Sequence, residues 1–147
     1  MKTTRAKFIP VSLLLLTIAL SPTLTGCSWA KGPGQDEMIR ILARRIAFHG
    51  VKKWPDHFAT LGRICQSACE ISQDREKAIQ GAFENITRVI LKDVNDPLLR
   101  ADMDSLIQLT GIKQDLHFKV LDITPDQGRV LEVIVCSFAE GTRLKSK

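Results

Sequence analysis

Three cysteines are the side chains best suited to chemistry in this chain. Cys65 and Cys69 lie four residues apart in a Cys-Gln-Ser-Ala-Cys segment, and Cys136 lies near the carboxyl end. This spacing differs from the Cys-x-x-Cys of redox motifs and from the paired cysteines of zinc ribbons. A structural disulfide is therefore the main prediction, with thiol or metal chemistry as the alternative.

The geometry of a helix predicts which disulfide forms. Side chains four residues apart on a helix have Cβ atoms about 5–6 Å apart, whereas a disulfide requires about 3.5–4.5 Å. A bond between Cys65 and Cys69 would distort the helix, so one of them should bond to Cys136. We predict the Cys69–Cys136 bond, with Cys65–Cys136 as the alternative. The remaining cysteine should be a buried free thiol, because cysteine packs as a small apolar residue.

The other polar side chains form no recognisable catalytic or metal-binding set. His49, His57 and His117 do not follow the His-Glu-x-x-His spacing of zinc proteases. The sequence has no Gly-x-Ser-x-Gly nucleophile elbow. Asp102 and Asp104 are two residues apart, which would place them on different sides of a helix. We therefore predict a protein without catalytic residues, cofactor or bound metal.

The first 27 residues have the layout of a secretion signal. Lys2, Arg5 and Lys7 precede an apolar segment, Phe8–Leu20, which at about 13 residues is too short to span a bilayer. Leu-Thr-Gly-Cys follows at residues 24–27. This pattern resembles the lipobox of bacterial lipoproteins, where the signal peptide is removed.

The resemblance implies that Cys27 becomes the first mature residue and carries acyl chains, which makes a membrane one of the partners. The absence of aspartate at position 28 implies sorting to the outer membrane, facing the periplasm. We expect three parts: a signal peptide (1–26), a lipidated cysteine with a short tether (27–35), and one small domain (36–147). The Gly-Pro-Gly of the tether should keep it irregular.

Removal of the signal peptide changes the electrostatics of the chain. The full sequence has 21 lysines and arginines against 16 acidic residues, a net charge of +5. Residues 1–26 hold three of the basic residues and none of the acidic ones, so the mature net charge is +2. This charge gives no reason to expect a nucleic-acid partner.

Hydrophobic periodicity predicts four helices in the first part of the domain. The predicted segments are Asp36–His49, a second from Asp56 through Ile71, about Gln73–Lys92, and a fourth from Asp96 to Gly111. Asp96 is a favourable N-cap, and the proline that follows it suits the first helical position. We expect Phe83 and Ile86 of the third segment to be buried.

The last part of the chain changes to a pattern typical of strands. Leu116–Thr124 and Arg129–Phe138 are rich in β-branched and apolar residues, and Pro125–Gly128 has the composition of a turn. These features predict an antiparallel β-hairpin. The expected fold is therefore α+β, with about four helices packed on a C-terminal hairpin.

One face of the predicted hairpin has more apolar side chains than a solvated surface needs. We predict that it binds a partner through Leu121, Ile123, Val130, Ile134 and Phe138. The favoured function is a non-enzymatic envelope lipoprotein: an accessory, pilot or structural component of a membrane-associated assembly, with an envelope protein as partner. The alternatives are a thiol- or metal-dependent enzyme or sensor using the three cysteines, and a module that binds a small apolar ligand.

Overall fold

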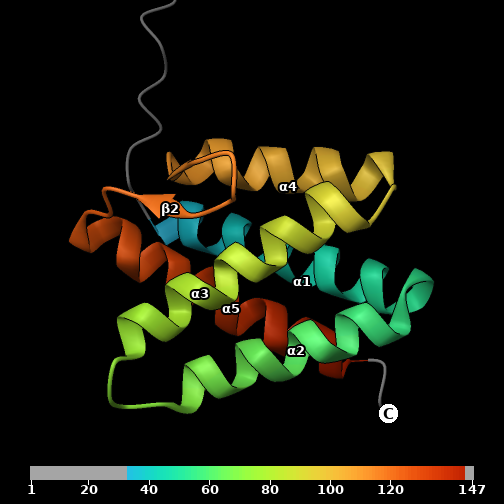
Figure 1. Ribbon diagram of the computed structural model, residues 1–147, viewed down its shortest axis with the longest axis horizontal. Helices are drawn as coiled ribbons and strands as arrows, with labels where there is room; N and C mark the ends of the chain where they lie inside the picture. Colours follow the sequence, from blue (N-terminus) through green and yellow to red (C-terminus); the bar gives the residue numbers. More distant parts are fainter. Residues whose placement is uncertain (1–32, 145–147) are drawn as a thin grey trace, which may run out of the picture. The chain divides into compact units, whose positions relative to one another are not determined.

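Five α-helices make up most of the fold in the computed structural model, which describes residues 33–144 (Figure 1). The elements are α1 (Pro33–Lys53), α2 (Pro55–Glu70), α3 (Arg75–Arg88), the π-helical turn η2 (Val89–Asp93), α4 (Pro97–Thr110), β1 (Lys113–Gln114), β2 (Val120–Leu121) and α5 (Pro125–Arg143). The two short strands pair antiparallel. None of the described helices combines the length and the apolar character required to cross a bilayer.

The predicted signal peptide, Cys27 and the tether as far as residue 32 lie outside the described residues. α1 begins at Pro33, inside the segment that we expected to be irregular. Proline is favoured at the start of a helix because the N–H that it lacks would have no partner there. α1 also continues past Gly50, where we expected it to end. Gly50 provides space instead, since a Cβ there would lie 2.0 Å from the Phe58 ring of α2.

The predicted α+β fold is wrong because the second predicted strand is a helix. Residues 129–138 lie within α5, and residues 125–128 form its first turn instead of a hairpin loop. The Thr124 hydroxyl accepts a hydrogen bond from the Gln127 N–H at 3.3 Å, and the Gln127 side chain accepts one from the Thr124 N–H at 3.0 Å. This reciprocal capping box, followed by proline at the first helical position, starts α5. The fold is therefore mainly α.

α5 is the central helix of the bundle and packs against α1, α2 and α3. Figure 1 shows it passing behind α2 and α3. Its buried side chains include Leu131, Ile134, Val135 and Phe138, which recur at the spacing of one helical face. Phe138 stacks on Phe58 of α2, with ring centroids 5.8 Å apart.

Two glycines allow α5 to approach its neighbours closely. A Cβ at Gly141 would lie 2.8 Å from the carbonyl oxygen of Arg44 in α1. A Cβ at Gly62 of α2 would lie 2.4 Å from Oγ1 of Thr142 in α5. Both distances are shorter than real Cβ contacts, so the close approach of these helices requires glycine at residues 62 and 141.

The predictions for α4 and for the core of α3 are confirmed. The Asp96 carboxylate accepts hydrogen bonds from the N–H groups of Leu98 and Leu99 at 2.9 and 3.0 Å and so caps α4. Gly111, with φ of 64°, ends it. Phe83 and Ile86 are fully buried, in a core that comes mainly from helices and not from the predicted hairpin of residues 116–138.

Candidate functional site

The cysteines lie on α2 and α5. Cys69, in the last turn of α2, forms a disulfide with Cys136 of α5, with Cα atoms 5.8 Å apart. This is the pairing that we preferred from the sequence, although Cys136 projects from a helix and not from a strand. The bond joins the end of α2 to the central helix.

Cys65 is a free thiol in the core beside this disulfide-bonded end of α2. Burial raises the pKa of the Cys65 thiol to about 12, so it stays protonated at neutral pH. A protonated thiol is a poor nucleophile and a poor metal ligand. Within residues 33–144, no three His, Cys, Asp or Glu side chains are grouped so that they could hold a metal ion. The thiol- and metal-dependent alternative therefore gains no support from the geometry.

The five residues of the predicted partner-binding face do not share a surface. Ile134 and Phe138 are buried in the core on α5. Leu121, on β2, is 44 % exposed, while Ile123 and Val130 are partly buried against the core. The predicted face depended on a hairpin. On a helix, residues 130, 134 and 138 are successive turns of one side, and here that side packs inward.

A concavity of about 460 Å³ lies between the beginnings of α3 and α5 and includes Ile123. Two charged residues of its lining, Arg75 and Glu132, form an ion pair with an Nη2–Oε1 distance of 2.6 Å. Arg75 also donates a hydrogen bond to the carbonyl oxygen of Cys69 at 2.7 Å. These two charged groups hold α2, α3 and α5 together and are not free to bind a ligand.

A polar cluster lies where the end of α1 meets the beginning of α4. The Asp96 carboxylate accepts a hydrogen bond from Nζ of Lys53 at 2.8 Å, in addition to the two backbone bonds that cap α4. The Lys53 bond, followed by the bond from the Leu99 N–H, lowers the pKa of Asp96 to about 2. Nε2 of His49 lies 3.9 Å from Asp96, beyond hydrogen-bond distance. Asp96 is fully used in joining α1 to α4, which indicates a structural role.

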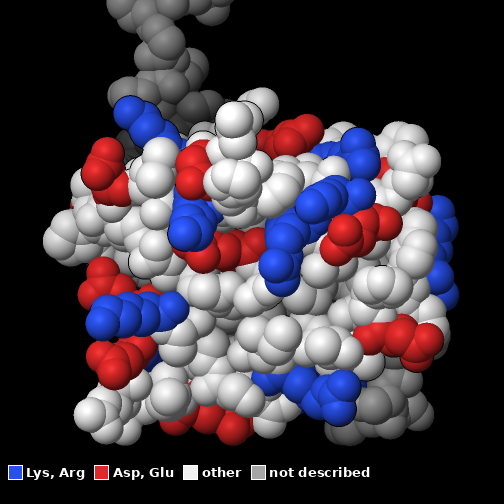
Figure 2. Space-filling model, viewed as in Figure 1, with Lys and Arg blue, Asp and Glu red and all other residues white. Residues whose placement is uncertain are grey.

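An open groove lies between α2 and α3 and consists of two adjoining concavities of about 440 and 350 Å³, both lined by Ile64. We call it the α2–α3 groove, formed by residues 56–71 and 77–89. Figure 2 shows an uncharged band that follows the line between the two helices across this face. The groove is therefore a continuous apolar surface with charges at its edges.

Two isoleucines give the α2–α3 groove much of its apolar character. Ile64 is 37 % exposed and Ile71 is 44 % exposed. The second predicted helix included both residues, but only Ile64 lies on the flank of α2, whereas Ile71 follows its last residue, Glu70, with an extended backbone. No local signal separates Ile64 from the buried apolar residues of α2, because α2 packs against three helices and their packing decides which side is covered.

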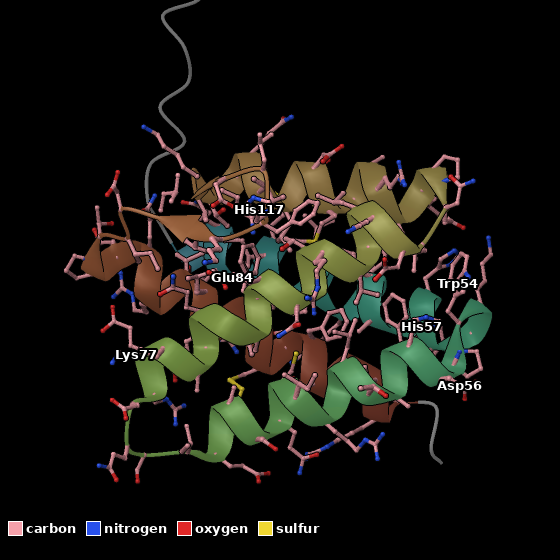
Figure 3. All side chains as sticks on the ribbon, in the orientation of Figure 1. Trp54, Asp56, His57, Lys77, Glu84 and His117 are labelled. Carbon is pink, nitrogen blue, oxygen red and sulfur yellow. A yellow bond between two sulfur atoms is a disulfide. The ribbon has the colours of Figure 1, made fainter. Side chains whose placement is uncertain are left out.

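The edges of the α2–α3 groove are positively charged. Arg63, Lys77 and Arg88 line it, against a single acidic residue, Asp56. Figure 3 shows Lys77 at one end of the groove and His57 with Asp56 at the other.

The three groove cations are not neutralised by the rest of the bundle. Within the part of the chain that the structure describes, none of Arg63, Lys77 and Arg88 forms an ion pair. Arg63 donates a hydrogen bond to Thr60, and Arg88 donates one to Asn85, each within its own helix. Their charge is therefore available to an acidic partner.

No protein-family model, curated protein or solved structure matches this chain. The function therefore has to be argued from the residues themselves. The α2–α3 groove joins exposed apolar side chains to uncompensated charge and is the candidate functional site.

Proposed function

We propose that the protein is a non-enzymatic lipoprotein of the bacterial envelope that serves as an accessory, pilot or structural component of a membrane-associated assembly. Acyl chains on Cys27 hold it at the membrane, and the α2–α3 groove binds another envelope protein. The observation that carries the proposal is the exposure of Ile64 and Ile71 along a groove that is also lined by unpaired cations. Exposed apolar surface with a polar rim is typical of protein-binding sites.

The Cys69–Cys136 disulfide supports a location outside the cytoplasm. Structural disulfides persist in oxidising compartments such as the periplasm and are rare in the cytosol. The lipobox-like residues 24–27 support export and lipidation, and serine instead of aspartate at position 28 supports the outer membrane.

The short connection between the anchor and the bundle restricts where a partner can be. From Cys27 to Pro33 the chain has six residues to extend, which reach about 21 Å at most. The domain must then stay close to the bilayer, so the partner should itself be a membrane protein or a protein bound at the membrane surface.

Site-specific photo-crosslinking in cells tests the binding site. A photoreactive residue in place of Ile64 should cross-link to an envelope protein. The matched control replaces Leu98 of α4, which is 45 % exposed but lies outside the groove, and should give much weaker cross-linking. Equal cross-linking at both positions, or none at Ile64, would contradict the groove as the site.

The anchor is tested separately with Cys27→Ser. The variant should leave the membrane fraction or remain uncleaved, because each buried CH₂ of an acyl chain contributes about 0.8 kcal/mol to membrane binding. Mass spectrometry of the native protein should find Cys27 at the mature N-terminus with acyl chains attached. An unlipidated N-terminus elsewhere would contradict the anchor.

A further inference from the structure

Gly81 differs from the other glycines in the interior of the helices. Gly50, Gly62 and Gly141 each have an atom within 2.8 Å of the Cβ position, so close packing requires them. Gly81 lies in the middle of α3, and a Cβ there would meet no atom within 4 Å. Its φ is not positive either, because Gly111 is the one described glycine in that region. The bundle therefore gains nothing from glycine at position 81, although glycine weakens a helix interior relative to alanine.

The position of Gly81 suggests a role in the binding of a partner. It lines the α2–α3 groove, between Lys77 and Arg88 along α3. A missing side chain in a groove lets a second backbone approach closely. A helix laid in the groove could therefore cross α3 at Gly81 with its backbone close to that of α3.

Charge identifies the occupant of the groove. Its cations, Arg63, Lys77 and Arg88, complement a segment that carries acidic side chains beside apolar ones. The undescribed parts of this chain do not provide such a segment, because residues 1–32 and 145–147 contain no Asp or Glu. The occupant that we consider is therefore a segment of another protein.

We propose that the α2–α3 groove binds an acidic amphipathic helix of a partner protein. Its apolar side chains contact Ile64 and Ile71, its acidic side chains lie beside Lys77 and Arg88, and its backbone crosses over Gly81. α3 has 14 residues and is thus about 21 Å long, which matches a partner helix of about four turns. This inference rests on the proposed function and adds the chemistry of the partner to it.

Three labelled synthetic peptides of about 16 residues, added to the full chain in detergent, test the inference by fluorescence anisotropy. The first forms a helix with a leucine stripe flanked by glutamates. The second replaces the glutamates by lysines, and the third keeps the glutamates but scatters the leucines. We expect the first to bind at least about tenfold more tightly than either of the others, with the difference from the lysine peptide shrinking as salt is raised.

Charge reversal tests the rim of the groove. Lys77→Glu combined with Arg88→Glu should reverse the preference, so that the lysine peptide binds more tightly than the glutamate peptide. Lys113→Glu combined with Lys119→Glu changes the net charge equally at the exposed β1–β2 hairpin, outside the groove. This control should keep the original preference.

Substitution of Gly81 tests the helix crossing. Gly81→Ala should raise the melting temperature yet weaken binding of the acidic peptide several-fold, and Gly81→Leu should abolish binding. Gly34→Leu is the matched control, because a Cβ at Gly34 also meets nothing within 4 Å but lies at the start of α1. If Gly81 had only a structural role, its substitution would change stability and peptide affinity in the same direction. A gain in stability together with a loss of affinity supports a docking role.

The possible results separate this inference from the proposed function. Three results would contradict binding of an acidic helix in the groove. They are no binding of the acidic peptide up to about 1 mM, equal binding of the acidic and basic peptides, and tight binding of the acidic peptide to the Gly81→Leu variant. Self-association of the chain through the groove would overturn it too. Cross-linking at Ile64 to an envelope protein would in each case leave the proposed function standing. Peptide binding without any cross-linked envelope protein would instead support the groove chemistry and contradict the proposed function.

Discussion

The two sides of α2 differ in how completely they are packed. Toward α5, Phe58 stacks on an aromatic ring, Gly62 permits close approach and Cys69 forms a disulfide. Toward α3, Ile64 and Ile71 remain exposed along an open groove. One helix therefore has a closed face toward α5 and a second side, toward α3, where part of the apolar surface stays open to solvent.

The two faces show how residues that serve folding differ from residues that serve function. On the closed face, each unusual residue has an internal reason, such as the space that Gly62 leaves for Thr142. On the open face, no contact within the described bundle explains why residue 81 is a glycine or why Arg63, Lys77 and Arg88 have no ion-pair partner. Residues that break local rules without internal compensation are expected at functional sites.

The largest expected effect comes from cutting the covalent link of the closed face. Cys69→Ser combined with Cys136→Ser should lower the free energy of unfolding by about 4 kcal/mol, because the bond closes a loop of 67 residues' separation. Urea denaturation of protein from an oxidising compartment measures this loss. Cys65→Ala is the control and should leave the disulfide intact in non-reducing peptide maps. A loss below about 1 kcal/mol would show that side-chain packing alone is enough to hold α2 against α5.

Overpacking the closed face should have the next largest effect. Gly62→Ala places a Cβ 2.4 Å from Oγ1 of Thr142 and should destabilise the protein by about 1–3 kcal/mol. Adding Thr142→Gly in the same chain should recover part of the loss by removing the clash. A neutral Gly62→Ala would show that α2 and α5 can separate without penalty, which would weaken the distinction between the two faces.

The same substitution on the open side should have the opposite sign. Gly81→Ala should stabilise the isolated protein by about 0.5–1 kcal/mol, since it restricts the unfolded chain and meets open space in the folded one. Thermal and urea unfolding measure the change beside Gly62→Ala. If Gly81→Ala were destabilising, position 81 would belong to the packed part of the bundle.

A pH-dependent effect concerns the contact of α1 with α4. The pKa of Asp96 lies near 2 in the folded protein, below the value of about 3.9 for an unfolded aspartate. Its stabilisation is therefore complete above about pH 4 and is lost as the pH falls toward 2. Asp96→Asn should flatten this part of the stability–pH curve, measured by urea denaturation between those values. An unchanged slope would place the acid sensitivity at other carboxylates, such as Asp115, whose pKa is also lowered.

Local signals in the sequence were enough to predict α4 and the disulfide. Asp96 and the proline after it define the beginning of α4, and Gly111 defines its end, because capping depends on residues within one turn. Helix geometry excluded a bond between Cys65 and Cys69 and left two pairings with Cys136, of which the preferred one, Cys69–Cys136, is the one that forms.

The sequence alone misled us about α5. Its β-branched residues, such as Val130 and Ile134, favour strands by propensity, and Pro125–Gly128 has the composition of a turn. The capping box of Thr124 and Gln127 was present in the sequence as a competing helix signal. Burial of α5 against three other helices decides in favour of the helix, since tertiary packing overrides weak local propensity.

The open groove was decided by tertiary structure alone. The sequence determines that Ile64 is apolar and lies beside the Phe58–Cys65 stripe of α2. Whether an apolar flank is covered depends on how the next helix packs, which periodicity within α2 cannot reveal. Here α3 packs on α2 with small residues, Ala78 and Gly81, facing the space between them, so the flank stays open to solvent.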